Sequence, residues 1–202
     1  MITIVDYGMG NLRSVERAFR WLGFDASIED DPEKVRAADS LVLPGVGAFG
    51  QARETLDALG LTPAIREYAA AGKALLGICL GMQLLASLGE EGGTFPGLDL
   101  VPGTVRRFPA GPKVPHVGWN EVSIRQVLPL FRGIPQGSYF YFVHSYELEP
   151  GDPATVAATT DYSGEFCSAV QAGNIFGVQF HPEKSGGAGL QLLRNFAEMG
   201  ML

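Results

Sequence analysis

One cysteine-containing turn constrains this chain more than any other feature of its sequence. Gly77-Ile78-Cys79-Leu80-Gly81 stands between an apolar run at residues 74–78 and a helix-like segment at residues 82–88. A Gly-x-Cys-x-Gly turn between strand and helix is typical of a nucleophile elbow, which presents its side chain from a strained backbone. The N–H groups and dipole of the following helix favour a thiolate over a thiol. The turn therefore predicts a reactive Cys79.

The alternative is that Cys79 is a packing residue, because unpaired cysteines are often buried and behave as small hydrophobic side chains. The far end of the chain favours the reactive interpretation. There a strand-like run at residues 177–180 leads into His181-Pro182-Glu183. A histidine at a strand end can take the thiol proton, and a carboxylate two residues later can orient the ring. We therefore expect Cys79, His181 and Glu183 to form a catalytic triad.

Composition predicts a folded globular chain. The 202 residues are 46% hydrophobic and 18% charged, which fits one domain over residues 1–202 with a substantial core. The net charge of −7 argues against a nucleic-acid partner, and no apolar run approaches the ~20 residues that cross a bilayer. Residues 1–6 lack the basic segment of a secretion signal, and two cysteines do not suggest a disulfide framework. We expect a cytoplasmic protein with no membrane partner.

Strands and helices alternate in the first half of the chain. This alternation predicts an α/β fold with an open, largely parallel central sheet and helices on both faces. In the second half, strand-like segments follow one another closely after a turn-rich run at residues 89–115, which predicts an antiparallel β extension. The expected strands are residues 2–6, 24–28, 40–43, 74–78, 104–108, 121–124, 139–147, 155–160, 166–171 and 175–180, and the expected helices are residues 12–22, one opening at Pro32, 62–72, 82–88 and 188–199.

Neither a cofactor nor a metal is predicted. The loop Gly8-Met9-Gly10 lacks the third glycine of a dinucleotide fingerprint. The chain has three histidines and no Cys or carboxylate at the spacing of a metal site. His116 and His144 stand without the His-x-Glu pattern, so we expect a structural or pocket role for both. Cys167, within a strand-like run, is expected to pack.

Three motifs taken together resemble the class I, triad-type glutamine amidotransferases: residues 44–47 (Pro-Gly-Val-Gly), 77–83 and 180–185. Four stretches spread over nearly the whole chain are more similar to one subfamily, the glutaminase subunits of imidazole glycerol phosphate synthases. They are residues 7–12, 44–49, 115–120 and 141–146. The resemblance implies that Cys79 attacks the glutamine carboxamide, that His181 moves the proton, and that Glu183 holds His181.

The same resemblance implies a substrate pocket and a partner. The released ammonia would pass to a (β/α)8-barrel cyclase that makes imidazole glycerol phosphate in histidine biosynthesis. Three residues would hold glutamine and three others would lie in stretches that meet the cyclase. The first set is Gln83, Ser145 and Tyr146, and the second is Asn11, Trp119 and Lys184.

An oxyanion hole must complete such a site. Losing one of its donors costs about 2.7 to 4 kcal/mol of transition-state stabilisation. Leu80 can supply one N–H, and the other is expected from the loop Gly45, Val46 and Gly47. A β-branched residue resists positive φ. We therefore expect the Val46 region to point its N–H away from the site until the cyclase and its ligand flip it.

Three other functions fit parts of this pattern. A stand-alone cysteine hydrolase would use the same elbow without a partner, and a catalytically silent binding module would use the fold without the triad. A glutaminase subunit of nucleotide, anthranilate or pyridoxal phosphate synthesis would keep the chemistry and change the acceptor. The stretches at residues 7–12 and 116–120 favour histidine biosynthesis through the resemblance.

Overall fold

The computed structural model describes residues 1–109 and 113–200, so part of the turn-rich run expected at residues 89–115 lies outside the described residues. The first half of the chain alternates strands and helices as expected. Its elements are β1 (Ile2–Val5), α1 (Leu12–Trp21), β2 (Ala26–Glu29), α2 (Pro32–Ala37), β3 (Ser40–Gly45), α3 (Phe49–Ala58), α4 (Leu61–Ala70), β4 (Leu75–Cys79) and α5 (Leu80–Leu84).

The second half consists mostly of strands and closes with the longest helix of the described residues. Its elements are β5 (Ala86–Gly89), β6 (Phe95–Pro96), β7 (Val101–Arg107), β8 (His116–Ile124), η1 (Pro129–Phe131), β9 (Ser138–His144), β10 (Tyr146–Pro150), η2 (Pro153–Thr155), β11 (Val156–Asp161), β12 (Glu165–Ala172), β13 (Ile175–Val178), η3 (Pro182–Lys184) and α6 (Gly186–Met199), where η marks a 3-10 helix.

One continuous sheet runs through the molecule. Its strand order is β2-β1-β3-β4-β13-β12-β10-β7-β5-β6, and β11, β8 and β9 branch from β12. The first five strands of this order are parallel, whereas β12, β10 and β7 continue the sheet through antiparallel pairs. The expected class, a largely parallel sheet with an antiparallel extension, is confirmed.

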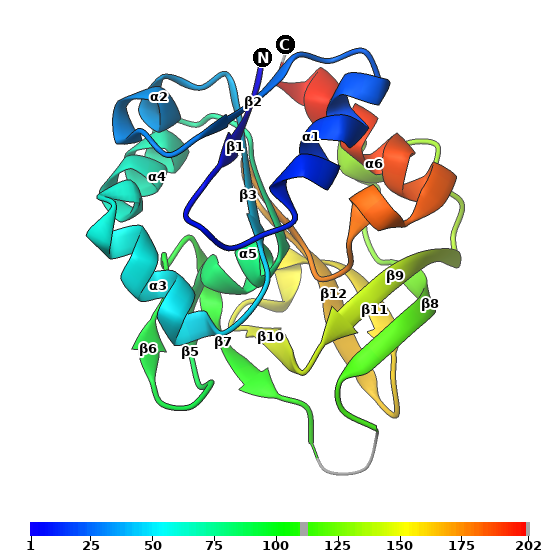
Figure 1. The fold of residues 1–202 in the computed structure, drawn as a ribbon. Helices are drawn as coiled ribbons and strands as arrows, with labels where there is room; N and C mark the ends of the chain where they lie inside the picture. Colours follow the sequence, from blue (N-terminus) through cyan, green and yellow to red (C-terminus); the bar gives the residue numbers. More distant parts are fainter. Residues whose placement is uncertain (110–112, 201–202) are drawn as a thin grey trace.

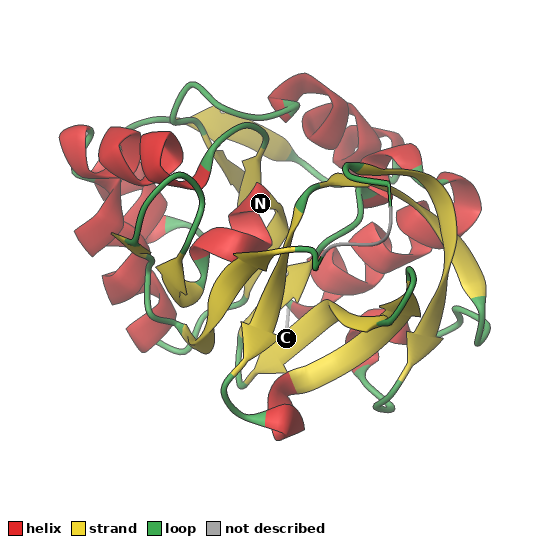
Figure 2. Ribbon diagram, turned by 90° about the horizontal axis from the view of Figure 1, so that it is seen from below, coloured by secondary structure: helices red, strands yellow, loops and turns green. Residues whose placement is uncertain are grey.

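Helices cover both faces of the parallel part of the sheet. Figure 1 shows α2, α3 and α4 on one side of β1 and β3, and α1 and α6 on the other. Figure 2, seen from below, shows the strands lying between these two groups of helices. Two hydrophobic cores result, one containing Phe19 and Phe196 and the other containing Leu56 and Ile65. Strands buried on both faces read as continuous apolar runs, which is why β3 and β4 were visible in the sequence.

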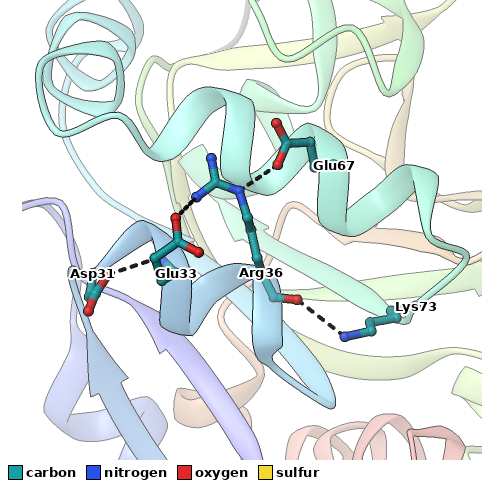
Figure 3. A network of polar contacts seen from close by, with 5 residues as sticks. All are labelled: Asp31, Glu33, Arg36, Glu67 and Lys73. Carbon is teal, nitrogen blue, oxygen red and sulfur yellow. Dashed lines mark hydrogen bonds and ion pairs between the residues drawn. The ribbon is translucent and has the colours of Figure 1, made fainter.

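The helix predicted to open at Pro32 begins there, and polar contacts hold it. The Asp31 carboxylate accepts a hydrogen bond from the Glu33 N–H at 2.9 Å, which satisfies one free donor of the first turn. Arg36 then joins Glu33 at 2.7 Å and Glu67 of α4 at 2.5 Å (Figure 3). The Lys73 ammonium donates to the Arg36 carbonyl at 3.2 Å. The two ion pairs of Arg36 are exposed, so they fix orientation more than they add stability.

The structure differs from the sequence-based expectation at several elements, three of them larger than a shift of a strand end. The helix expected at residues 82–88 ends at Leu84, and Ala86–Gly89 forms β5 beside β7. A short, mostly apolar run has no periodicity that separates helix from strand, so tertiary pairing decides. The strand expected at residues 139–147 is broken at Ser145, because β9 pairs with β8 whereas β10 pairs with β7 and β12. Helix α3 was not expected, although Phe49, Ala52 and Leu56 mark its buried face.

The cysteine turn has the strained geometry of a nucleophile elbow. Cys79 ends β4 with φ 55° and ψ −112°, in the left-handed half of the map that side chains rarely adopt. A Cβ on Gly77 would lie 2.7 Å from the Gly81 carbonyl oxygen, and a Cβ on Gly81 would collide with the Leu43 carbonyl oxygen of β3. Because glycine carries no Cβ at these two positions, α5 can start against the ends of β3 and β4.

We expect Gly81→Ala to lower the free energy of unfolding by more than about 3 kcal/mol, because the new methyl meets backbone atoms that cannot move independently. Chemical denaturation would measure the change. Gly187→Ala is the matched control, since a Cβ there has no neighbour within 4 Å and the site lies in the first turn of α6. Equal stability of the two variants would contradict the packing argument.

Candidate active site

The ends of three neighbouring parallel strands bring the predicted residues to one edge of the sheet. β3, β4 and β13 are neighbours, with Gly45 opposite Cys79 and Ile78 opposite Val178. The loop after β3 therefore lies on one side of Cys79, and the segment after β13, which carries His181, lies on the other. This edge is where open α/β sheets place their sites.

Cys79, His181 and Glu183 are brought together in a dry environment. Cys79 is 6% exposed, and the side chains of His181 and Glu183 are 2% and 1% exposed. The Nδ1 atom of His181 lies 2.9 Å from Glu183 Oε1. This bond orients the ring and leaves its Nε2 atom to act on the thiol. Nε2 is buried and has no hydrogen-bond partner among the described residues.

The electrostatics of His181 favour its charged form. Burial alone lowers the pKa of an imidazole, but Cys79 and Glu183 outweigh burial and raise the pKa of His181 to about 9. At neutral pH the ring is therefore an imidazolium beside the sulfur. A thiolate paired with an imidazolium is the nucleophilic form of cysteine, and the same ring holds the proton that a leaving amine needs.

A short polar network fixes the backbone that carries His181. The Ser185 hydroxyl donates to the His181 carbonyl at 2.6 Å and accepts from the Tyr141 N–H at 3.0 Å. The His181 N–H donates to the Tyr141 carbonyl at 2.9 Å. The one-turn helix η3 is thereby tied to β9.

The loop after β3 lies against a buried tyrosine. The Tyr7 hydroxyl donates to the Pro44 carbonyl at 2.8 Å, and a Cβ on Gly45 would collide with that hydroxyl. Burial and then the neighbouring Cys79 raise the pKa of Tyr7 well above its usual range, so it remains a donor. Gly47 has a positive φ of 102°, whereas the φ of Val46 is not positive.

A cavity of about 280 Å³ opens beside Cys79. It is lined by six of the other residues that the sequence placed in the site, and four further residues complete the lining. The first group is Val46, Gly47, Leu80, Gln83, Ser145 and Tyr146, and the second is Glu91, Pro115, Val143 and His144. Gly45, His181 and Glu183 are not part of this lining. Within the described residues, no cluster of three or more His, Cys, Asp or Glu could hold a metal ion.

Glu91 is a cavity residue that the sequence analysis missed. Its carboxylate accepts a hydrogen bond from the Phe49 N–H at 2.8 Å, at the start of α3. It therefore joins the loop after β5 to the helix that follows the Val46 loop. Acidic residues at a helix N-terminus are favoured by the helix dipole, but the helix lies 42 residues earlier, so no local sequence pattern could reveal this contact.

His116 and His144 form a buried pair behind the cavity. His144 donates from Nδ1 to the Tyr146 carbonyl at 2.9 Å, so its Nε2 accepts from His116 Nδ1 at 3.0 Å. The Nε2 of His116 then accepts from the Asn120 amide at 3.2 Å. Burial lowers the pKa of His116 to about 4 and that of His144 to about 3. Both rings are neutral near pH 7, and His144 also lines the cavity.

Two of the three residues expected to meet a partner, Trp119 of β8 and Lys184 of η3, lie near each other through Tyr141 of β9. Trp119 is 56% exposed and packs edge-on against Tyr141, over whose ring the Lys184 ammonium lies at 5.8 Å from the centroid. Asn11 immediately precedes α1, which contacts η3. Cys167 is a free, buried cysteine of β12, as expected, and burial raises its pKa to about 12.

We expect the neutral histidine pair to make stability depend on pH in acid. Below the ordinary pKa of 6.5 the unfolded chain protonates both rings and the folded chain does not, so acidification favours unfolding. Between pH 4.5 and 6, acidification should lower the unfolding free energy of the wild type more steeply than that of a His116→Gln/His144→Gln variant. The difference in slope should correspond to the uptake of up to about two more protons on unfolding.

Urea unfolding at several pH values would measure both slopes. Glu147, whose pKa burial raises to about 7, titrates over an overlapping range but is present in both proteins and cancels in the comparison. Parallel slopes would mean that the buried rings do not carry this dependence.

Comparison with known proteins agrees with this geometry. The family model of class-I glutamine amidotransferases matches residues 3–199. The imidazole glycerol phosphate synthase subunit HisH of Moorella thermoacetica is 56% identical over 198 residues, covering 98% of this chain and 94% of that protein. The protein with the same description from Chlorobium luteolum is 54% identical over 200 residues, covering 98% and 100%. A solved structure of a glutamine amidotransferase has a TM-score of 0.79 at 20% identity, covering 100% of each chain, which supports the fold alone.

Proposed function

The chain belongs to the class-I glutamine amidotransferases, and from this premise we propose that it hydrolyses glutamine to glutamate and ammonia for a biosynthetic partner. The observation that carries the proposal is the arrangement around Cys79. A cysteine in an elbow with φ 55° borders a cavity and lies beside a buried His181–Glu183 pair. That set of groups matches what thioester chemistry on an amide requires.

The proposed reaction follows from the roles that the geometry permits. The Cys79 thiolate attacks the side-chain carboxamide carbon, and a tetrahedral oxyanion forms. The His181 imidazolium gives its proton to the departing nitrogen, which leaves as ammonia, and a thioester to Cys79 remains. His181, now neutral, takes a proton from water as the water oxygen attacks the thioester. The carbon–sulfur bond breaks and releases glutamic acid, which loses its side-chain proton to solvent, and the Cys79–His181 ion pair is restored.

The cavity supplies groups for the amino-acid end of glutamine. Gln83, Ser145 and Tyr146 were expected there and line the cavity. Glu91 adds a carboxylate to the lining, and we assign it to the substrate ammonium group, because a carboxylate pairs with a cation in a confined site. A volume of about 280 Å³ suits a small amino acid better than a peptide, which disfavours a stand-alone peptidase.

The proposed oxyanion hole uses the Leu80 N–H and one N–H of the loop Gly45, Val46 and Gly47. Val46 is 42% exposed and lines the cavity, so it adjoins both solvent and substrate. Its ordinary φ fits a β-branched residue, and turning its peptide toward the site requires a backbone change. We assign that change to the bound partner, which makes the isolated chain a slow glutaminase.

The proposed partner is a (β/α)8-barrel cyclase that receives ammonia and makes imidazole glycerol phosphate in histidine biosynthesis, in the cytoplasm. The names of the similar proteins support this acceptor over those of nucleotide, anthranilate or pyridoxal phosphate synthesis. No helix within residues 1–109 and 113–200 is long and apolar enough to cross a membrane. The docking surface would be an apolar strip on β8 and β9, which we name the β8–β9 strip: the exposed Val117, Trp119, Tyr139 and Val143 and the half-buried Tyr141.

We expect glutamate release from glutamine to be slow for the purified chain and to rise strongly when a cyclase subunit and its nucleotide ligand are added. Supplying a missing oxyanion donor alone is worth about 10²- to 10³-fold in kcat. The measurement is a coupled glutamate assay, with Cys79→Ser as the control that removes the nucleophile. Equal rates with and without the cyclase would contradict the proposed activation by the partner, while the proposed role of Cys79 would stand. No glutamate under any condition would return Cys79 to a packing role.

We expect Trp119→Ala to weaken cyclase binding by more than about tenfold, because large aromatic side chains at the centre of an interface dominate its energy. Calorimetric titration of the cyclase would give the dissociation constants. Trp21→Ala is the matched control, since Trp21 is 74% exposed but ends α1, away from the β8–β9 strip. An equal effect of the two substitutions would argue against docking on this strip.

A further inference from the structure

Gln179 is a fully buried polar side chain that the mechanism above leaves without a role. It follows β13 and stands two residues before His181, and its exposed fraction is 0%. Its amide nitrogen lies 3.8 Å from Cys79 Sγ, and its amide oxygen accepts a hydrogen bond from Gln83 Nε2 at 3.0 Å. The side chain therefore bridges the sulfur and a residue of the cavity wall.

The orientation of the Gln179 amide is fixed by its neighbours. A backbone carbonyl can only accept, so the Tyr146 carbonyl requires the Gln83 nitrogen at their 2.9 Å contact. The same nitrogen gives its second hydrogen to Gln179, which places the Gln179 oxygen on that side. The Gln179 nitrogen must then face Cys79. The donor and acceptor in each of these hydrogen bonds therefore follow from the Tyr146 carbonyl, and do not rest on telling the amide oxygen from the nitrogen by position alone.

We propose that Gln179 stabilises the Cys79 thiolate by donating an N–H to its sulfur, and that Gln83 and the Tyr146 carbonyl hold this donor in place. The proposal rests on the proposed function, in which Cys79 is the nucleophile. A hydrogen bond to an ionised acceptor is about twice as strong as one between neutral groups, so the donor favours the thiolate over the thiol.

The surroundings of the sulfur make such a donor necessary. The Val143 carbonyl oxygen lies 3.9 Å from Sγ and offers an acceptor, which suits a thiol and opposes a thiolate. The imidazolium of His181 opposes that effect, but in the proposed reaction it gives its proton away. The Gln179 amide keeps its hydrogens throughout. It therefore stabilises the sulfur again when the thioester breaks and the thiolate departs.

The bridge also links the nucleophile to the substrate cavity. Both hydrogens of the Gln83 amide are used, one on Tyr146 and one on Gln179. Its oxygen is consequently the atom that Gln83 can offer to a ligand. Loss of Gln179 would leave Gln83 free to rotate, whereas loss of Gln83 would leave the Gln179 amide free to turn away from the sulfur.

The test is the pH profile of Cys79 alkylation by iodoacetamide, a reagent that does not need the glutamine pocket. We expect the midpoint of the profile to move upward by about one to two pH units in Gln179→Met, since Met fills similar space without a strong donor. At pH values below both midpoints the rate should fall about tenfold or more. Mass spectrometry distinguishes label on Cys79 from label on Cys167, the other cysteine of the sequence.

Gln171→Met is the matched control. Gln171 lies on β12 of the same hairpin and donates to the Gly173 carbonyl at 3.1 Å, so its replacement should leave the midpoint unchanged. Coinciding profiles for Gln179→Met and the wild type, with both proteins folded by circular dichroism, would overturn the proposal. A shift of the same size in Gln171→Met would assign the effect to general disturbance of the hairpin and would overturn it equally.

If Gln179→Met does not fold, a second measurement on the wild type tests the same hydrogen bond. In protein labelled with ¹⁵N-glutamine, one side-chain N–H resonance of Gln179 should move with pH at the midpoint found by alkylation. A resonance that stays fixed through that midpoint would rule out the bond. A wild-type Cys79 that resists alkylation at every pH would instead count against the proposed function itself.

Discussion

The fit of a helix start against two strand ends is the constraint on which the rest of this structure depends. Gly81 lies so close to the Leu43 carbonyl of β3 that no side chain could occupy its place, and Gly77 is nearly as confined. This fit holds Cys79 at a positive φ, a conformation that costs free energy and persists only where surrounding packing dictates it. The nucleophile is thus placed by contacts between backbones, and its own side chain stays free to react.

Buried polar groups then give the site its charge pattern. The Tyr146 carbonyl accepts from Gln83 on one side and from His144 on the other, so two chains of hydrogen bonds meet at one atom. The chain through His144 consists of neutral rings, while His181 beyond the sulfur is charged. Burial acts on all three histidines in the same direction. The difference is that Cys79 and Glu183 act together to raise the pKa of His181, whereas the hydrogen-bond partners of the other two rings are neutral.

Local pattern in the sequence accounts for the order of strands and helices and for the residues that carry the chemistry. The elbow around Cys79 and the His181–Glu183 pair were visible because their neighbours in sequence are also their neighbours in space. Glu91 and Gln179 were missed for the opposite reason. Glu91 meets the start of α3 across 42 residues, and Gln179 meets Cys79 across 100. The break at Ser145 was missed because it depends on which strands pair with β9 and β10, and a continuous β-prone run carries no sign of that choice.

The position of the β8–β9 strip has a consequence for control of the proposed reaction. Val143 belongs to this strip and also lines the cavity. Val46, of the loop after β3, lines the same cavity. A partner docked on the strip would therefore reach the cavity rim without a long relay through the protein. Cys79 and Glu183 already raise the pKa of His181 in the isolated chain, so the acid–base group is charged before any partner binds. Under the proposed mechanism the nucleophile is ready in the isolated chain, and the missing part is the oxyanion donor. Control then acts on the stability of the tetrahedral intermediate, where a single N–H is worth several kcal/mol.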